Sequence, residues 1–217
     1  MMAKGYTYEP TPAEMVLTEL VGNTLLSGYY RDLVRGFDLP GTARVLDYCC
    51  GSGIIAAKIA TQLRAGGRLV VAEVSERWLC RAAGRLQRFP GAACAHLTGL
   101  QGRILGGDYD AIVVHFVLHD FLAQLRPLVL QQLLQNLRGQ GTLYLREPLG
   151  ERHGMQLFEL INLLEATKSL DYDYQVRRQA LVGCFVDIRC RLKPGPSNQP
   201  STGEAGRPAS SAIASAG

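Results

Sequence analysis

The residue types best suited to chemistry lie in one short stretch, ARVLDYCCGSG, at residues 43–53. An apolar run ends at Asp47, two cysteines follow, and Gly51 and Gly53 enclose a serine. Glycines after a strand let the backbone approach a ligand closely, and a helix that follows points its free N–H groups at that ligand. The pattern therefore predicts a nucleotide-binding turn, with the adjacent cysteines as a competing redox or metal site.

The spacing of the cysteines argues against that competing site. The chain has six cysteines, but it contains no Cys-x-x-Cys pair and no His-x3-5-His pair, so the spacing of zinc ligands is absent. The neighbouring Cys49 and Cys50 are poor disulfide partners, because a bond between them would distort the peptide that joins them. We therefore expect small apolar cysteine side chains in a reducing compartment, and no metal site.

Two cofactors are compatible with the glycine turn. GSGIIA at residues 51–56 satisfies the Gly-x-Gly-x-x-Gly/Ala pattern of dinucleotide sites, and Glu73 lies 20 residues past Gly53, where a carboxylate can accept ribose hydroxyls of either cofactor. Asp47 distinguishes the two. Its negative charge would repel a pyrophosphate, whereas it suits a ligand that carries an amino group and a sulfonium.

Four motifs, in order, resemble those of the class I S-adenosylmethionine-dependent methyltransferases. VLDYCCGSG resembles the Asp-x-Gly-x-Gly-x-Gly junction of that family, with Cys49 where the first glycine usually stands. VVAEVS, YDAIVVHFVLHDF and LLQNLRGQGTLYLREP resemble the second-, fourth- and fifth-strand motifs. The resemblance covers about residues 41–192 and implies a Rossmann-like fold, S-adenosylmethionine as cofactor, and methyl transfer to an O, N, S or C nucleophile.

The resemblance also implies which residues bind the cofactor. Glu73 would bind the ribose, and Val74 would lie against the adenine. The family often has an aspartate after the third strand, but Leu100 stands in that region, so backbone and apolar contacts would hold the adenine. The full set of predicted cofactor residues is Asp47, Tyr48, Cys49, Gly51, Ser52, Gly53, Glu73, Val74, Leu100 and His115.

His119 is the candidate catalytic residue. It follows the fourth predicted strand, and an imidazole titrates near neutrality, so it could act as a general base. The alternative is a loop histidine that binds backbone or water. We expect Asp120 to cap the next helix, although it could instead orient the ring of His119. His115 lies inside the strand, which favours a place in the core or in the cofactor wall.

Strand-like and helix-like segments alternate along the chain, which predicts an α/β fold with a doubly wound, mainly parallel sheet. Helices are expected at residues 54–63, 76–89, 127–137 and 155–170, and strands at residues 43–48, 68–74, 92–98, 109–117, 141–147 and 184–192. The family's sheet usually has seven strands. We therefore expect either six strands, with 184–192 beside 141–147, or a strand supplied by a partner chain. An exposed strand edge would favour a homodimer.

Three regions are predicted. Residues 1–40 form an N-terminal helical extension, whose tyrosines Tyr6, Tyr8, Tyr29 and Tyr30 either pack ordinarily or act as a lid over the substrate. Residues 41–193 form the cofactor-binding methyltransferase domain. Residues 194–217 consist mainly of Pro, Gly, Ser and Ala, which predicts a disordered tail.

Composition restricts the partners. The net charge is +4 and no run of five Lys/Arg occurs, so we expect neither nucleic acid nor a membrane as partner. The stripe Arg77, Arg81, Arg85 and Arg88 is interpreted as a solvated helix face. No apolar h-region or 18-residue apolar stretch is present, which predicts a cytoplasmic protein. A small-molecule acceptor is expected. The alternatives are a non-catalytic S-adenosylmethionine-binding or assembly module and an NAD(P)-binding oxidoreductase.

Overall fold

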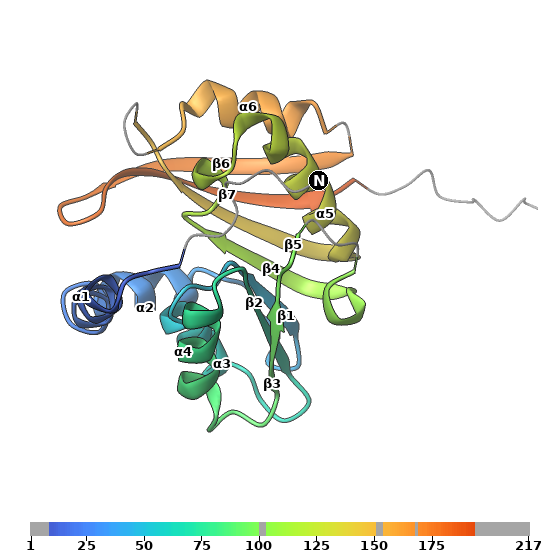
Figure 1. Ribbon diagram of the computed structural model, residues 1–217. Coiled ribbons are helices and arrows are strands. Elements are labelled where there is room, and N and C mark those ends of the chain that lie inside the picture. Colours follow the sequence, from blue (N-terminus) through green and yellow to red (C-terminus); the bar gives the residue numbers. More distant parts are fainter. Residues whose placement is uncertain (1–8, 100–102, 151–153, 168, 194–217) are drawn as a thin grey trace, which may run out of the picture.

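One seven-stranded sheet runs through the protein. The computed structural model describes residues 9–99, 103–150, 154–167 and 169–193. The strands follow the order β3-β2-β1-β4-β5-β7-β6, and β1 to β5 are parallel while β7 is antiparallel to both of its neighbours (Figure 1). Their bounds are β1 Arg44–Tyr48, β2 Arg68–Glu73, β3 Ala92–His96, β4 Tyr109–His115, β5 Leu137–Pro148, β6 Leu170–Gln179 and β7 Gly183–Leu192.

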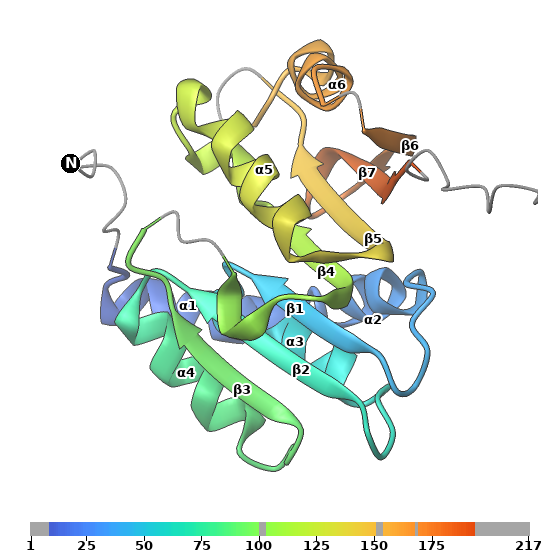
Figure 2. The same ribbon diagram turned by 90° about the vertical axis from the view of Figure 1, so that its right-hand side faces the viewer.

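Helices cover both faces of the sheet (Figure 2). One core cluster joins the sheet to α2 Ser27–Arg35, α3 Ile54–Ala60 and α4 Glu76–Leu86. A second cluster joins the opposite face to α5 Arg126–Asn136 and α6 Leu157–Glu165. The N-terminal α1 Pro12–Asn23 lies beside α2 and α4, and single turns of 3-10 helix occupy Ile104–Gly106, Leu118–Asp120 and Ala123–Leu125. Among the described residues, no helix has both the length and the apolar character needed to cross a bilayer.

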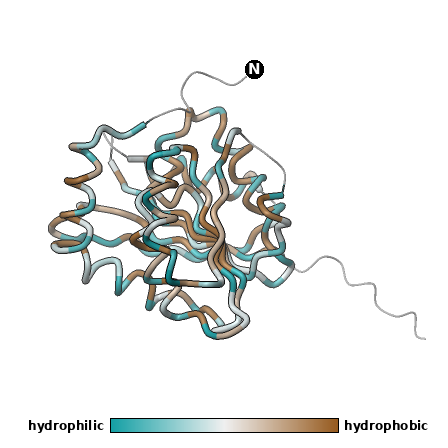
Figure 3. The backbone as a smooth tube through the Cα atoms, turned by 60° about the horizontal axis from the view of Figure 1, so that its bottom comes forward, coloured by the Kyte–Doolittle hydropathy of each residue, from teal (hydrophilic) through white to brown (hydrophobic). Residues whose placement is uncertain are grey.

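Local sequence explains most of these elements. The central strands β1, β2 and β4 are mostly buried and mainly apolar, as expected of strands covered on both faces. Figure 3 shows hydrophobic residues concentrated along the strands in the middle of the molecule. Thr11 and Glu14 form a capping box at the start of α1. Ser75 caps α4 and Pro127 lies in the first turn of α5. The predicted doubly wound α/β fold is confirmed.

The predicted strand number was wrong, because the sheet has seven strands rather than six and needs none from a partner chain. The additional strand is β6, which forms an antiparallel hairpin with β7 and places β7 between β5 and β6. Its sequence, LDYDYQVRRQ, has polar residues at most positions, and Leu170 is its one fully buried residue. An edge strand exposed on most of its surface gives neither an apolar run nor a clean alternation, so the sequence pattern missed it. The helix expected over 155–170 ends at Glu165.

Candidate active site

A cavity of about 520 Å³ lies at the carboxyl ends of β1, β2 and β4, where doubly wound sheets bind their ligands. Four predicted cofactor residues line it: Cys49, Gly51, Glu73 and Val74. The other residues that line it were not predicted to bind the cofactor, and they are Ser75, Trp78, Phe116, Val117, Asp120 and Phe121. The glycine turn and the end of the second strand therefore meet as expected, while the opposite wall comes from the segment after β4.

The turn after β1 is built from three residues in the left-handed region. Gly51 and Gly53 have φ of 53° and 74°, and Cys49, which stands where the family has its first glycine, also has φ 53°. A Cβ on Gly53 would lie 2.9 Å from the Cβ of Ala82 in α4, so this glycine permits α3 and α4 to pack closely. A Cβ on Gly51 would meet nothing within 4 Å, which agrees with its place on the cavity wall. Ser52 is buried and does not line the cavity.

The carboxylate of Glu73 joins this turn to the cavity. Its Oε2 accepts a hydrogen bond from the Gly51 amide at 2.7 Å, and its Oε1 accepts bonds from the amides of Val74 at 2.8 Å and Ser75 at 3.1 Å. Burial raises the pKa of Glu73, although the three amides oppose that shift. A carboxylate has about four acceptor positions, so about one remains for a ligand hydroxyl.

Asp47 does not line the cavity. It lies at the end of β1 with 2% of its surface exposed, and it accepts a hydrogen bond from the Ala56 amide in α3. Its Oδ2 has no hydrogen-bond partner in the described part of the chain. Burial, and after it the charge of Glu73, raises the pKa of Asp47 to about 8. The sequence analysis assumed that Asp47 carries a fixed negative charge. With a pKa of about 8, its carboxyl group is instead largely protonated at neutral pH.

Two further predicted cofactor residues have no described contact with this cavity. The ring of Tyr48 is buried in the core cluster beneath α5, where its hydroxyl donates to Gln132 at 3.3 Å. Leu100 lies outside the described residues.

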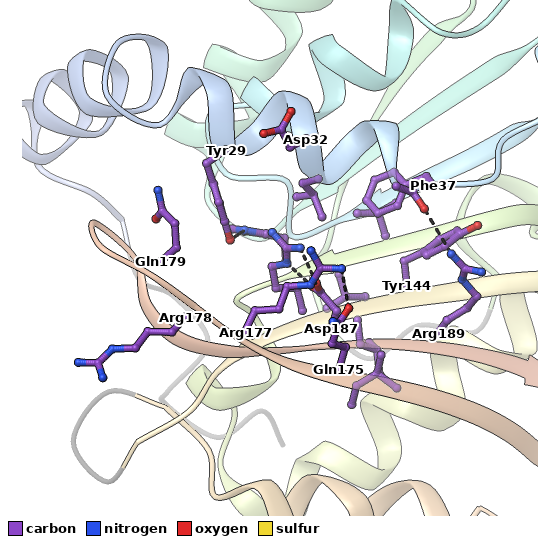
Figure 4. Close-up of a pocket in the computed structure, with 18 of the residues that line it drawn as sticks. Tyr29, Asp32, Phe37, Tyr144, Gln175, Arg177, Arg178, Gln179, Asp187 and Arg189 are labelled. Carbon is purple, nitrogen blue, oxygen red and sulfur yellow. Dashed lines mark hydrogen bonds and ion pairs between the residues drawn. The ribbon is translucent and has the colours of Figure 1, made fainter.

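A second cavity, of about 660 Å³, lies between α2 and the strands β5, β7 and β6 (Figure 4). His115 lines this cavity instead of the first. The hydroxyl of Tyr29 lies 3.1 Å from Nε2 of His115. Burial, and then the charge of Arg146, lowers the pKa of His115 to about 3, so the ring is neutral. His115 was expected in the core or in the wall of the cofactor site, but the structure places it in the wall of the second cavity, away from the other predicted cofactor residues.

The two cavities share a wall. The rings of His115 and Phe116 are stacked with their centroids 4.2 Å apart, and Phe116 lines the first cavity while His115 lines the second. Phe116 has φ 57°, a left-handed conformation that a bulky side chain rarely adopts. Phe116 is thus held in a strained backbone conformation between the two cavities.

A charged and aromatic group forms one side of the second cavity. The carboxylate of Asp187 lies between two guanidinium groups, with Arg146 Nη2 at 2.7 Å and Arg177 Nε at 3.0 Å, which leaves one net positive charge. The guanidinium of Arg146 also lies 5.0 Å from the ring of Tyr29 and 4.5 Å from the ring of Phe185. Figure 4 shows Tyr29 directed from α2 toward this group.

His119 is held by a buried carboxylate. Glu147, fully buried near the end of β5, accepts hydrogen bonds from the amides of Val117 and Leu118 and from Nδ1 of His119 at 2.9 Å. Nε2 of His119 lies 3.3 Å from Asp120. Burial lowers the pKa of His119, but the hydrogen bond and charge of Glu147 outweigh burial and raise it. Asp120 was expected to cap the next helix. This was wrong, because α5 begins at Arg126 without a side-chain cap.

Sequence reasoning also missed Glu147. The available signal was an acidic residue in an otherwise apolar strand, since LYLREP places a charged pair at the carboxyl end of β5. Such a position lies at the ligand-binding edge of a parallel sheet.

The arginine stripe on α4 is exposed at Arg77, Arg81 and Arg88, as expected of a solvated face, but Arg85 is half-buried against the N-terminal segment. Arg85 Nη2 lies 2.6 and 2.5 Å from the two oxygens of Glu19 in α1, and Arg85 Nε donates to the Ser52 carbonyl at 3.0 Å. Arg81 reaches Glu19 as well, and Arg77 donates to the Pro10 carbonyl. These contacts fasten α1 to α4 and to the glycine turn. Tyr6 and Tyr8, the other tyrosines proposed as a lid, lie outside the described residues.

Comparison with known proteins agrees with this geometry. A family model described as "Methyltransferase domain" matches residues 46–143, and no curated protein matches the chain. The N-methyltransferase NodS from Bradyrhizobium japonicum WM9, solved with S-adenosyl-L-homocysteine, is similar with 20% identity and a TM-score of 0.64, over 80% of this chain and 90% of that one. The pyocyanin biosynthetic protein PhzM has 14% identity and a TM-score of 0.67, over 83% of this chain and 59% of that one.

Magnesium protoporphyrin IX methyltransferase ChlM from Synechocystis PCC 6803, solved with bound S-adenosylmethionine, has 18% identity and a TM-score of 0.58. The matched regions cover 87% of this chain and 88% of ChlM. At these identities the likeness establishes the fold, and the family model establishes the kind of domain.

Proposed function

We propose that this chain, which has the domain and the fold of a class I S-adenosylmethionine-dependent methyltransferase, transfers a methyl group to a small-molecule acceptor with an O, N, S or C nucleophile. The observation that carries the proposal is the pair of cavities that meet at His115 and Phe116. NodS is named an N-methyltransferase, PhzM a pyocyanin biosynthetic protein and ChlM a magnesium protoporphyrin IX methyltransferase, which supports a small acceptor.

The first cavity suits the cofactor. Glu73 offers a buried carboxylate with about one acceptor position left for a ribose hydroxyl, and open space lies beside Gly51. Val74 and Trp78 supply apolar walls suited to an adenine. Asp47 acts indirectly, because it holds the first turn of α3 beneath the glycines and does not reach the cavity. When bound, S-adenosylmethionine supplies a methyl group that its sulfonium already activates.

The second cavity suits the acceptor. Tyr29, Phe37, Tyr144 and His115 offer aromatic faces, and the group around Asp187 offers one net positive charge. For a class of reaction whose electrophile is already activated, the protein mainly aligns the reacting atoms and excludes water. The aromatic lining would exclude water from the reacting centre.

His119 is the proposed general base where the acceptor must lose a proton. Glu147 accepts from Nδ1, so Nε2 would take the proton. Nε2 lies 3.3 Å from Asp120, which lines the first cavity, whereas His119 itself lines neither cavity, so Asp120 would have to release Nε2 and the ring would have to reach the acceptor. Because Glu147 raises the pKa of His119, its base form becomes the major form only at a higher pH than for an ordinary histidine, so activity would increase as the pH rises through that pKa.

A non-catalytic S-adenosylmethionine-binding module is the second candidate, and the shared wall is the observation that favours it. The stacked His115 and Phe116 stand between the two cavities, so transfer requires this pair to move. A protein in which it stayed closed would bind the cofactor without methylating anything.

Calorimetric titration with S-adenosylhomocysteine and with NAD tests the cofactor assignment. We expect S-adenosylhomocysteine to bind and NAD to fail. Glu73→Ala should weaken binding of S-adenosylhomocysteine by about 1–3 kcal/mol, the usual loss for charge-assisted hydrogen bonds. Glu76→Ala is the matched control, because its side chain is 78% exposed on the adjacent helix and does not line the cavity.

Unchanged affinity in Glu73→Ala would contradict the ribose contact, and binding of NAD alone would favour the oxidoreductase. Incubation of labelled cofactor with candidate metabolites then separates an enzyme from a binding module. The cytoplasmic location, the lack of a nucleic-acid partner and the division at residues 1–40, 41–193 and 194–217 stay predictions.

A further inference from the structure

The strand β6 forms one edge of the sheet, and no described residue pairs with its outer side. Figure 2 shows it as the outermost strand beyond β7, and the strand order has no neighbour on its other side. It is ten residues long and exposed at most positions. An edge of this length offers a row of backbone donors and acceptors to another strand.

The backbone groups that point outward can be identified from the pairing of β7. The Lys193 amide donates to the Ser169 carbonyl on the β6 side, whereas the Cys184 carbonyl accepts from the Leu149 amide on the β5 side. Odd-numbered residues of β7 therefore bond to β6, and the register pairs them with odd-numbered residues of β6. The even-numbered Tyr172, Tyr174, Val176 and Arg178 direct their N–H and C=O groups outward. Within the described residues, no hydrogen bond joins these outward groups to another element.

The side chains of β6 are self-complementary about Gln175. On one face, Asp173 precedes Gln175 by two positions and Arg177 follows it by two. On the other face, Tyr174 and Val176 flank the same position and are 50% and 45% exposed. An antiparallel copy of this strand, centred on Gln175, therefore places opposite charges opposite each other and apolar side chains opposite each other.

We propose that two copies of the chain associate by antiparallel pairing of β6 with β6 about a two-fold axis at Gln175, which joins their sheets. Tyr172 would pair with Arg178 of the second copy and Tyr174 with Val176 of the second copy, each pair occurring twice. These four pairs would form about eight backbone hydrogen bonds. Asp173 would lie opposite Arg177 of the second copy twice, in the close pairs where opposite charges stabilise a sheet.

The same observations select this register over its neighbours. If the pairing shifted by one residue, even-numbered residues, whose backbone groups point outward, would lie opposite odd-numbered residues, whose backbone groups already bond to β7. The hydrogen bonds between the two copies would then be lost. A two-fold axis at Tyr174 would pair Arg178 with Leu170, whose amide already donates to the Thr167 carbonyl. A two-fold axis at Val176 would place Arg177 opposite Gln175 and remove both ion pairs. Arg177, which binds Asp187 through Nε, is 53% exposed and has further N–H groups for a partner carboxylate.

Sedimentation equilibrium of the full chain tests the association. The wild type should have twice its 23.7-kDa mass at concentrations well above a micromolar. Val176→Pro removes one outward N–H per copy and no bond between β6 and β7, so it should raise the dimer dissociation constant about 10- to 100-fold. Val176→Thr keeps the N–H and the branched side chain, and should behave like the wild type. A circular dichroism melt of each variant checks that it is folded.

Charge exchange and cross-linking test the register. Asp173→Arg should weaken the dimer, and the double variant Asp173→Arg/Arg177→Asp should restore it. Gln175→Cys should give a disulfide-linked dimer under mild oxidation, because the two copies of residue 175 face each other across the axis in a close pair. The two copies of Asp173→Cys would stand four positions apart, so this control should cross-link no more than the wild type, which carries six cysteines of its own.

A monomeric wild type would overturn the proposal. So would a dimer that is unaffected by Val176→Pro and not cross-linked through Gln175→Cys, because it would use another surface. Asp173, Gln175 and Arg177 also line the second cavity, but the mass and the cross-linking of the chain are read without any measurement of methyl transfer. Failure of either proposal therefore leaves the other standing.

Discussion

The replacement Asp47→Asn tests the electrostatics beneath the glycine turn. Asp47 is 2% exposed, its Oδ2 has no partner among the described residues, and burial raises its pKa from 3.8 to about 8. In the unfolded chain the same carboxyl group is in water and keeps its ordinary pKa. The folded protein therefore holds a proton that the unfolded chain releases over most of this pH range.

The sign and size of the effect follow from this difference. Below pH 3.8 Asp47 is protonated in both the folded and the unfolded chain, so it makes no contribution to the pH dependence of stability there. As the pH rises from there toward 8, unfolding releases a proton, so the free energy of unfolding falls by about 1.4 kcal/mol per pH unit. Asparagine does not titrate. Between about pH 5 and about pH 7.5, the stability of Asp47→Asn relative to wild type should rise by about 3 kcal/mol.

Urea unfolding followed by circular dichroism measures the free energy of unfolding of both proteins. Wild type and variant are compared at each pH, so that the contributions of the other titrating groups cancel. The exposed Asp38→Asn is the matched control and should follow the wild type. A difference between Asp47→Asn and wild type that stays constant from pH 5 to 7.5 would refute the reasoning. It would mean that Asp47 is ionised in the folded protein and is stabilised by a group that the structure does not pair with it.

Two other predictions concern the turn and the histidine. Gly53→Ala should lower the free energy of unfolding in urea by about 2–4 kcal/mol, because φ is 74° and the new Cβ would lie 2.9 Å from the Cβ of Ala82. Gly51→Ala should lower it by only about 1–2 kcal/mol, because its new Cβ would meet no atom within 4 Å. Equal losses in the two variants would contradict the packing argument. Glu147→Gln should move the NMR titration of His119 to lower pH by removing its charged partner, and Asp120→Asn should move it less, because that side chain is 75% exposed. An unmoved His119 titration in Glu147→Gln would show that another group holds the proton.

Much of the fold could be predicted because the signals are local. Strands β1, β2 and β4 are covered on both faces and read as continuous apolar runs. The glycine turn and Glu73 lie at the ends of two such strands, and neighbouring parallel strands end at the same edge, so their meeting at one cavity followed from the order of elements alone.

The protonation of buried groups and the ion pairs between distant segments could not be predicted in this way. The sequence identified Asp47, but its protonation depends on burial and on Glu73, a residue brought beside it only by the pairing of β1 with β2. Arg85 has the spacing of a solvated residue, and its partner Glu19 is brought to it by the packing of α1 on α4.

By itself, the sequence determined the alternation of strands and helices, the position of the glycine turn, and the methyltransferase domain that its motifs indicate. Only the tertiary structure decided that β6 completes the sheet, that Glu147 holds His119, and that His115 faces a second cavity. The physical reason is that backbone propensity and hydrophobic periodicity act between near neighbours in the chain. Burial, ion pairs and edge-strand pairing depend instead on residues that are distant in sequence and meet only when the chain folds.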